Sequence, residues 1–292
     1  MKRWTIIVLL SFFISCQQDE NMEQQSGTIP VGGYSVYYET AGKGEPLLLL
    51  HAGLQNSAMW EDQVKDFSKD HQVITIDLPF HGKTTGIDTT ILAKDVVKTV
   101  LDSLKIKKAS VVGLSMGAAI TQDFAIHYPQ RVNKVVLMSS ALYGYEDAHP
   151  VDTSTFAWYR KLLAALEGKD TAKAALIFTQ TWSEGIDSES DSLTKQASHY
   201  VYQTTLRTLR QHQLKNWPNL QDDPKAYAGI STLRMPVLIL HGDRDQPIIA
   251  ETSQYLEKAI PGAKRIEMKG MAHMINMEQP AEVNKLLRAF LK

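Results

Sequence analysis

The sequence predicts an α/β fold, in which a mostly parallel β-sheet is flanked by helices and a helical segment is inserted between two strands. Short apolar runs, typical of strands buried on both faces, alternate with longer segments of helical periodicity. The 292 residues, 43% of them hydrophobic, suffice for one large domain or for a core with an insertion. Residues 142–230 contain only helical patterns, which indicates where the insertion lies.

The strands and helices of the core follow in order along the chain. The first strand is predicted at 32–40, where Tyr34, Val36 and Tyr38 alternate onto one face. Continuous apolar runs predict further strands at 46–50, 73–76, 109–112, 135–138 and 236–240. Helical patterns occupy 59–68, 91–104, 116–128, 254–260 and 281–291. Strands and helices in this alternation favour βαβ units on a parallel sheet.

The segment 142–230 interrupts that alternation. Helices are predicted at 153–166, 171–182 and 192–214, with no buried strand between them. A whole βαβ unit takes about 30 residues, far fewer than this segment, so an ordinary crossover does not account for it. We therefore expect a core of residues 30–141 and 231–292 and a helical cap of residues 142–230.

The N-terminus has the layout of a secretory signal peptide. Lys2 and Arg3 precede an apolar run over 4–14, which is shorter than the about 20 residues that span a bilayer. We expect residues 1–15 to be the signal peptide.

The end of this run, Phe13-Ile14-Ser15-Cys16, resembles the lipobox of bacterial lipoproteins. The resemblance implies a lipid on Cys16 and attachment to the membrane on the periplasmic or surface face of the cell envelope. The polar composition of residues 17–26 predicts a flexible tether, and we expect the lipidated cysteine and this tether to occupy residues 16–29. The alternative is an ordinary cleaved signal peptide followed by an incidental cysteine.

Charge and cysteine content exclude several classes of protein. The chain has 31 Lys+Arg against 32 Asp+Glu, so it lacks the basic excess that nucleic-acid binding requires. A single cysteine permits neither an internal disulfide nor the cysteine pairs of a structural zinc site. We expect no metal and no organic cofactor, and the oligomeric state stays open.

The segment Gly113-Leu114-Ser115-Met116-Gly117 matches the G-x-S-x-G nucleophile elbow, and it lies directly between a buried strand and a helix. A tight turn there presents the serine hydroxyl, and the two glycines avoid Cβ clashes in the turn. The motif predicts Ser115 as a nucleophile. The alternative is a plain tight turn.

Candidates for the base and its orienting acid follow later strands. Asp243 and Asp245 come after the strand at 236–240, and His273 follows a further strand at Lys264–Met268. The order Ser, Asp, His is that of α/β-hydrolases. The order alone leaves open which aspartate is the acid.

From about residue 30 to 292 the chain resembles the α/β-hydrolase superfamily, above all capped esterases and 3-oxoadipate enol-lactonase-like hydrolases. The resemblance is carried by five segments, at 47–60, 77–84, 111–119, 238–248 and 270–280. It implies Asp245 as the acid, with Asp243 as the fallback, and His273 as the base.

The same resemblance implies an oxyanion hole made by two backbone N–H groups, those of Gly53 and Met116. His51 is expected to brace the loop that carries Gly53, and His81 to hold a neighbouring turn. Ala52 and Phe80 stand where the family usually has glycine.

Together these features imply a serine hydrolase that cleaves a small carboxylic ester, lactone or thioester through an acyl-enzyme. Alternatives on the same residues are a carbon–carbon bond hydrolase, an acyltransferase, and a membrane-anchored binding module. Candidate pocket residues are Leu54, Trp60, Tyr143 and Phe156, although aromatic residues at helical spacing more often pack inside a cap.

Overall fold

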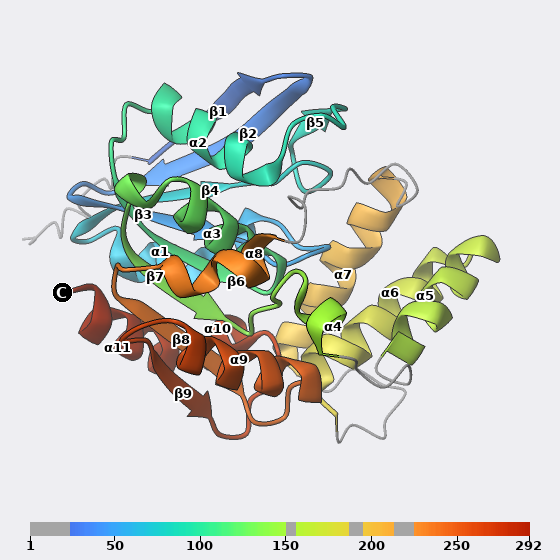
Figure 1. Cartoon of the computed structure of the whole chain (residues 1–292). Helices are drawn as coiled ribbons and strands as arrows, with labels where there is room; N and C mark the ends of the chain where they lie inside the picture. The colour runs from blue at the N-terminus through green and yellow to red at the C-terminus, as the bar shows by residue number, and fades with distance from the viewer. Residues whose placement is uncertain (1–23, 150–155, 187–194, 213–224) are drawn as a thin grey trace, which may run out of the picture.

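A nine-stranded, mostly parallel β-sheet runs through the part of the chain that the computed structural model describes, residues 24–149, 156–186, 195–212 and 225–292 (Figure 1). The strands lie in the order β1 (Gln24–Val31), β2 (Tyr34–Ala41), β4 (His71–Ile76), β3 (Glu45–Leu50), β6 (Ala109–Leu114), β7 (Val132–Met138), β8 (Val237–Gly242) and β9 (Lys264–Met268). From β4 to β9 all neighbours are parallel, whereas β1 and β2 are antiparallel, and the short β5 (Thr85–Gly86) pairs with β2. The α/β prediction is confirmed.

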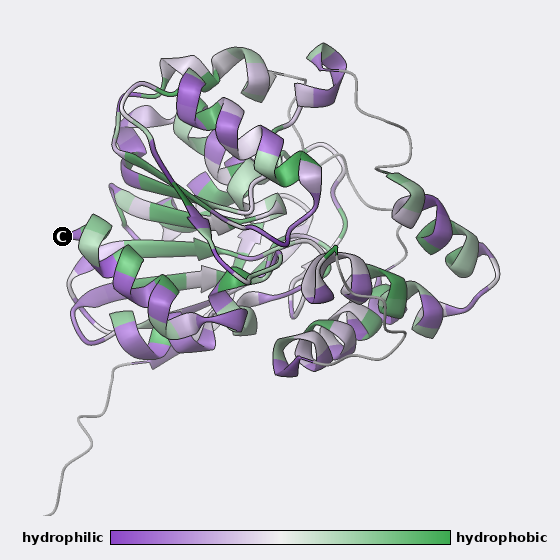
Figure 2. Ribbon diagram, turned by 90° about the horizontal axis from the view of Figure 1, so that it is seen from below, coloured by the Kyte–Doolittle hydropathy of each residue, from purple (hydrophilic) through white to green (hydrophobic). Residues whose placement is uncertain are grey.

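Helices cover both faces of this sheet. One face carries α2 (Ala93–Ser103), α3 (Met116–His127), α8 (Lys225–Gly229) and α9 (Pro247–Ala259). The other carries α1 (Glu61–Phe67), α10 (Ile275–Glu278) and α11 (Pro280–Leu291), with a 3₁₀ turn at Ser57–Trp60 before α1. In Figure 2 the strands are mostly hydrophobic and the helices carry both colours, as expected of amphipathic helices that cover a buried sheet.

The central strands are buried on both faces. In β3, Leu47, Leu48, Leu49 and Leu50 have no exposed surface. Because successive side chains of a strand point to opposite faces, Leu48 and Leu50 pack with α2 and α3, while Leu47 and Leu49 pack with α1 and α11. Each buried leucine contributes about 1.5–3 kcal/mol, which explains why these strands are continuous apolar runs in the sequence.

The helices of the inserted segment lie together beside the sheet (Figure 1). They are α5 (Ala157–Glu167), α6 (Thr171–Thr179), a π-helical turn at Gln180–Glu184, and α7 (Gln196–Gln211), preceded by the short α4 (Tyr145–Ala148). Contacts between α5 and α6 and between α6 and α7 hold the group together. Within the described residues, α5, α6 and α7 overlap the three helices predicted at 153–166, 171–182 and 192–214, and the segment 142–230 also contains the short helices α4 and α8. The role of the segment as a cap stays a prediction.

The N-terminal prediction needs one correction. The tether was expected to extend to residue 29, but Gln24–Val31 forms β1, which pairs with β2 along its whole length. Backbone hydrogen bonds to β2 and the burial of Ile29 and Val31 offset the polar composition that suggested a flexible segment. The expected signal peptide, Cys16 and the tether up to residue 23 lie outside the described residues. In the described part of the chain, no helix has the length and apolar character needed to cross a bilayer.

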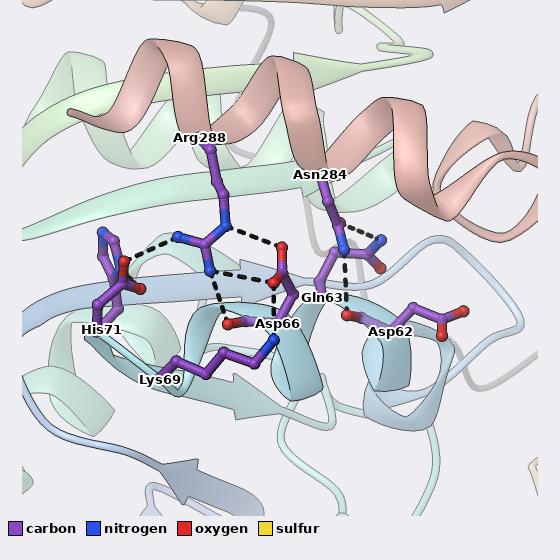
Figure 3. A network of polar contacts seen from close by, with 8 residues as sticks. Asp62, Gln63, Asp66, Lys69, His71, Asn284 and Arg288 are labelled. Atoms are coloured by element: carbon purple, nitrogen blue, oxygen red, sulfur yellow. Dashed lines mark hydrogen bonds and ion pairs between the residues drawn. The ribbon is translucent and has the colours of Figure 1, made fainter.

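Polar side chains join α11 to α1 on the outer surface of one helical layer (Figure 3). Arg288 donates from Nε to Asp66 Oδ2 at 3.0 Å and from Nη1 to Asp70 Oδ2 at 2.8 Å. Its guanidinium also lies over the ring of Phe67, 4.6 Å from the centroid. The C-terminal helix is thereby attached to the helix that follows the first buried strand.

Candidate active site

Ser115 occupies a strained turn between β6 and α3. Its backbone angles are φ 56° and ψ −114°, in a region that L-residues rarely adopt. A Cβ atom on Gly113 would overlap the carbonyl oxygen of Gly117, and one on Gly117 would overlap that of Leu50. The flanking glycines are therefore required by the close approach of the backbone, as the motif predicts.

The strand register brings the three loops that carry Ser115, Asp245 and His273 to one edge of the sheet. Neighbouring strands pair Leu114 with Met138, Met138 with Leu240, and Gly242 with Met268, so β6 to β9 all end at the same side. The Ser115 N–H donates to the carbonyl of Met138 at 2.9 Å. This edge, beyond the carboxyl ends of the strands, is where open α/β sheets place their ligands.

His273 and Asp245 form a buried pair at this edge. His273 Nδ1 lies 2.9 Å from Asp245 Oδ1 and 2.8 Å from Oδ2, and the two side chains are only 3% and 1% exposed. A carboxylate can only accept, so Nδ1 carries the proton and Nε2 is the nitrogen left free to accept one. Asp243 instead accepts from Gly270 N at 2.7 Å and contacts Lys269, so of the two aspartates only Asp245 is paired with the histidine.

Two buried histidines hold the loop after β3. His51 Nε2 accepts from Leu78 N at 2.9 Å, while its Nδ1 donates to the carbonyl of Ala52. His81 Nε2 accepts from Leu54 N at 3.0 Å, and its Nδ1 donates to Pro79. Both rings must be neutral to accept in this way. The expected bracing by His51 and His81 is present.

Burial keeps these histidines neutral. It lowers the pKa of His51 to about 4, partly offset by the hydrogen bond to Ala52. Burial also lowers the pKa of His81 to about 3, and the neighbouring His51 adds to the effect. The loop is therefore held by uncharged acceptors throughout the neutral pH range.

The loop after β3 lies against the start of α3. A Cβ atom on Gly53 would come 3.8 Å from the Cβ and Sδ atoms of Met116. Within the described residues, neither Gly53 N nor Met116 N donates a hydrogen bond. Ala52 has no positive φ, so alanine is accommodated there, whereas Phe80 adopts φ 65°, the conformation for which glycine is usual.

The π-helical turn of the inserted segment contacts the loops of both Asp245 and His273. His273 N donates to the carbonyl of Trp182 at 3.2 Å, and the two rings lie 4.4 Å apart. Gln246 Nε2 donates to the Thr181 carbonyl at 2.9 Å. The sequence did not identify Trp182, because nothing in its local sequence indicates which aromatic residue of the inserted segment reaches the histidine.

The four candidate pocket residues do not share one environment. Leu54 and Trp60 are buried in the core on the α1 and α11 side of the sheet, and Trp60 has no exposed surface. Tyr143 packs against the core on the opposite side. Phe156 is 37% exposed at the start of α5. Aromatic and apolar type alone therefore did not identify a common pocket.

Among the described residues, no group of three or more acidic, histidine or cysteine side chains could hold a metal ion.

Comparison with known proteins gives one family and several relatives. The family model described as alpha/beta hydrolase fold matches residues 45–280. The (E)-2-((N-methylformamido)methylene)succinate hydrolase of Acinetobacter baylyi is 26% identical over 88% of this chain and 94% of its own. The 3-oxoadipate enol-lactonase 2 of the same organism is 26% identical over 91% and 96%, respectively. Carboxylesterase YbfK of Bacillus subtilis is 25% identical over 84% and 79%.

A solved structure shows the same fold. A hydrolase from Pseudomonas aeruginosa PA01 superimposes with a TM-score of 0.75 at 20% identity, over 94% of this chain and 99% of that one.

Proposed function

The chain belongs to the alpha/beta hydrolase fold family, and from that premise we propose that it is a serine hydrolase that cleaves a small carboxylic ester, lactone or thioester. The observation that carries the proposal is the buried His273–Asp245 pair, which lies at the same sheet edge as the strained Ser115. A histidine oriented by a buried carboxylate is the arrangement that activates a serine hydroxyl.

In the proposed reaction, Ser115 Oγ attacks the acyl carbonyl while His273 Nε2 takes the hydroxyl proton. Asp245 stabilises the resulting imidazolium and keeps Nε2 directed to the serine. The Gly53 and Met116 N–H groups donate to the oxyanion, and Met116 adds the favourable dipole of the α3 N-terminus. His273 then protonates the departing alkoxide or thiolate, which leaves an acyl-enzyme on Ser115.

The second half of the proposed reaction repeats these roles with water. His273 takes a proton from water, the hydroxide attacks the acyl-enzyme, and the C–O bond to Ser115 breaks. His273 returns the proton to Ser115, and the carboxylic acid leaves. Every step uses only groups of the chain, the substrate and water.

Relatives support the substrate class, since similar chains are named as an enol-lactonase, a carboxylesterase and a hydrolase of a substituted succinate. A serine at the elbow suits acyl transfer to oxygen.

Ester turnover and active-site labelling test the proposal. Wild-type protein and Ser115→Ala are assayed on a panel of esters, lactones and thioesters and exposed to a fluorophosphonate probe. We expect Ser115→Ala to lose roughly 10⁴-fold or more in kcat/KM and to remain unlabelled. The matched control is Ser103→Ala, since Ser103 is exposed on α2.

Retained ester turnover in Ser115→Ala would contradict the proposal. An unlabelled wild type that turns over no member of the panel would favour a membrane-anchored binding module. An acyltransferase would be recognised by transesterified product when an alcohol acceptor is supplied.

A further inference from the structure

Two consecutive backbone N–H groups of the His273 loop are held from different parts of the chain. The Ala272 N–H donates to both carboxylate oxygens of Glu278, each at 3.1 Å. The His273 N–H donates to the carbonyl of Trp182 in the π-helical turn. The backbone on which the imidazole is mounted is thus fixed between α10 and the inserted segment.

Glu278 is itself tied to the inserted segment through Lys195, the residue before α7. Lys195 Nζ lies 2.6 Å from Glu278 Oε2, and it also donates to the Ser183 carbonyl at 2.9 Å. The Lys195 N–H donates to Glu184 Oε1 at 3.3 Å. One ammonium group therefore connects the π-helical turn, the start of α7 and the carboxylate that holds Ala272.

The ion pair of Lys195 and Glu278 is partly shielded from solvent. The Glu278 side chain is 5% exposed and that of Lys195 is 24% exposed, so the ions are much less screened than a surface pair. A carboxylate at this depth requires compensation for lost hydration, and Lys195 and the Ala272 N–H supply it. Removing Lys195 leaves the buried carboxylate without its cation, so the carboxylate moves toward solvent and releases Ala272.

We propose that the Lys195–Glu278 ion pair positions His273 for proton transfer by fixing the Ala272 N–H, and so couples the inserted segment to the reaction. The inference rests on the proposed serine hydrolase function. Lys195 and Glu278 are positioning residues, since they act through the backbone of the histidine loop.

Displacement of the His273 imidazole lowers the rate of cleavage most for esters with poor leaving groups. An alkoxide needs a proton from His273 as it departs, whereas a phenoxide departs largely without one. A displaced imidazole therefore lowers the rate for an ethyl ester more than for the phenyl ester of the same acid. Partial unfolding would lower both rates by the same factor, because it only reduces the amount of active enzyme.

The experiment measures kcat/KM for this ester pair in wild type, Glu278→Gln, Lys195→Met and the double variant. We expect the ethyl-to-phenyl ratio to fall about 10-fold in each single variant. The double variant should be no worse than the poorer single one, because the two side chains act as a unit. Lys195 borders a surface cavity of about 600 Å³, so a shorter side chain fits there without a clash.

Matched controls come from an exposed ion pair on α11. Lys285 Nζ lies 3.5 Å from Glu282 Oε2, and the two side chains are 76% and 49% exposed. Glu282→Gln and Lys285→Met repeat the same chemical changes at a surface pair outside the histidine loop, and we expect them to leave the ester ratio unchanged.

A substrate-free readout separates this inference from the proposed function. The Nδ1 proton of His273, bonded to Asp245, is followed by proton NMR, and it should shift or broaden in Glu278→Gln and Lys195→Met but not in the controls. If the wild type cleaves no ester yet this resonance changes, the function fails and the positioning stands. If the wild type cleaves esters while the ester ratio and the resonance stay unchanged in both folded variants, the positioning role is overturned.

Discussion

At the scale of single residues, three buried histidines differ in what their Nε2 atoms contact. In His51 and His81 both ring nitrogens are engaged with backbone groups, so these rings can only hold the loops together. In His273 the Nδ1 atom is held by Asp245, which leaves Nε2 for a substrate or a serine. Environment thus separates a structural histidine from a candidate base, although the residue type is the same.

The neutral histidines make stability depend on pH. The folded pKa values of His51 and His81, about 4 and about 3, lie below the ordinary value of 6.5. The unfolded chain therefore binds more protons below pH 6.5, and stability falls as the pH falls. Each histidine should lower the free energy of unfolding by about 2 kcal/mol when the pH falls from 7.5 to 5. Urea unfolding at the two pH values measures this change.

The control for this pH effect is a non-titrating replacement. His81→Gln should be less stable than wild type at pH 7.5 but lose less stability on going to pH 5. An unchanged pH dependence in His81→Gln would show that His81 is not responsible. His199→Ala, at an exposed position on α7, should retain the wild-type dependence.

At the scale of elements, α11 depends on α1 as well as on the sheet. Val283 and Leu287 bury the inner face of α11, and Arg288 joins its outer face to Asp66 and Asp70. The hydrogen bond from Arg288 also holds the pKa of Asp66 below its usual range. The guanidinium is therefore a link between the two helices that a lysine could reproduce only in part.

Arg288→Ala should lower the free energy of unfolding by about 1–2 kcal/mol, since it removes two ion pairs and the contact with Phe67. Chemical denaturation with intact secondary structure at zero denaturant is the measurement. Lys285→Ala serves as the control, because its contact with Glu282 is exposed, and it should change stability by less than about 0.5 kcal/mol. Equal effects of the two substitutions would contradict this account.

Elements with strong local signals were predictable, and elements stabilised by distant partners were not. The apolar runs in β3, β6 and β8 follow from burial on both faces, because successive residues of such a strand are then apolar. Strand β1 has a polar composition, and it forms because β2 supplies hydrogen-bond partners. The π-helical turn likewise has no local signature, and its hydrogen bonds to the loops of Asp245 and His273 come from distant residues.

At the scale of the whole molecule, the N-terminal sequence contains a candidate site for a lipid anchor. The resemblance of residues 13–16 to a lipobox leads us to propose that Cys16 carries a lipid and holds the folded chain at the cell envelope. Covalent acyl chains contribute about 0.8 kcal/mol per buried CH₂ group, so such an anchor needs no apolar helix in the folded part.

Cys16→Ser should therefore move the protein from the membrane fraction to the soluble fraction of a bacterial host, with ester turnover unchanged. Immunoblotting of washed membranes measures the distribution, and Gln17→Ser is the neighbouring control. Retention of Cys16→Ser in the washed membranes would exclude the lipid anchor.

The sequence by itself determined the α/β class, the positions of the main strands along the chain and the tight turn at Ser115. Burial requires apolar residues throughout the central strands, and steric exclusion requires the glycines on either side of Ser115. The order of the residues left Asp243 and Asp245 as candidates for the acid, and the resemblance to α/β-hydrolases implied Asp245. Only the tertiary structure decided that Asp245 pairs with His273, that Trp182 reaches the histidine, and that Glu278 holds the loop beside it. Those contacts join residues far apart in the chain, and their geometry depends on how the sheet and the inserted helices pack together.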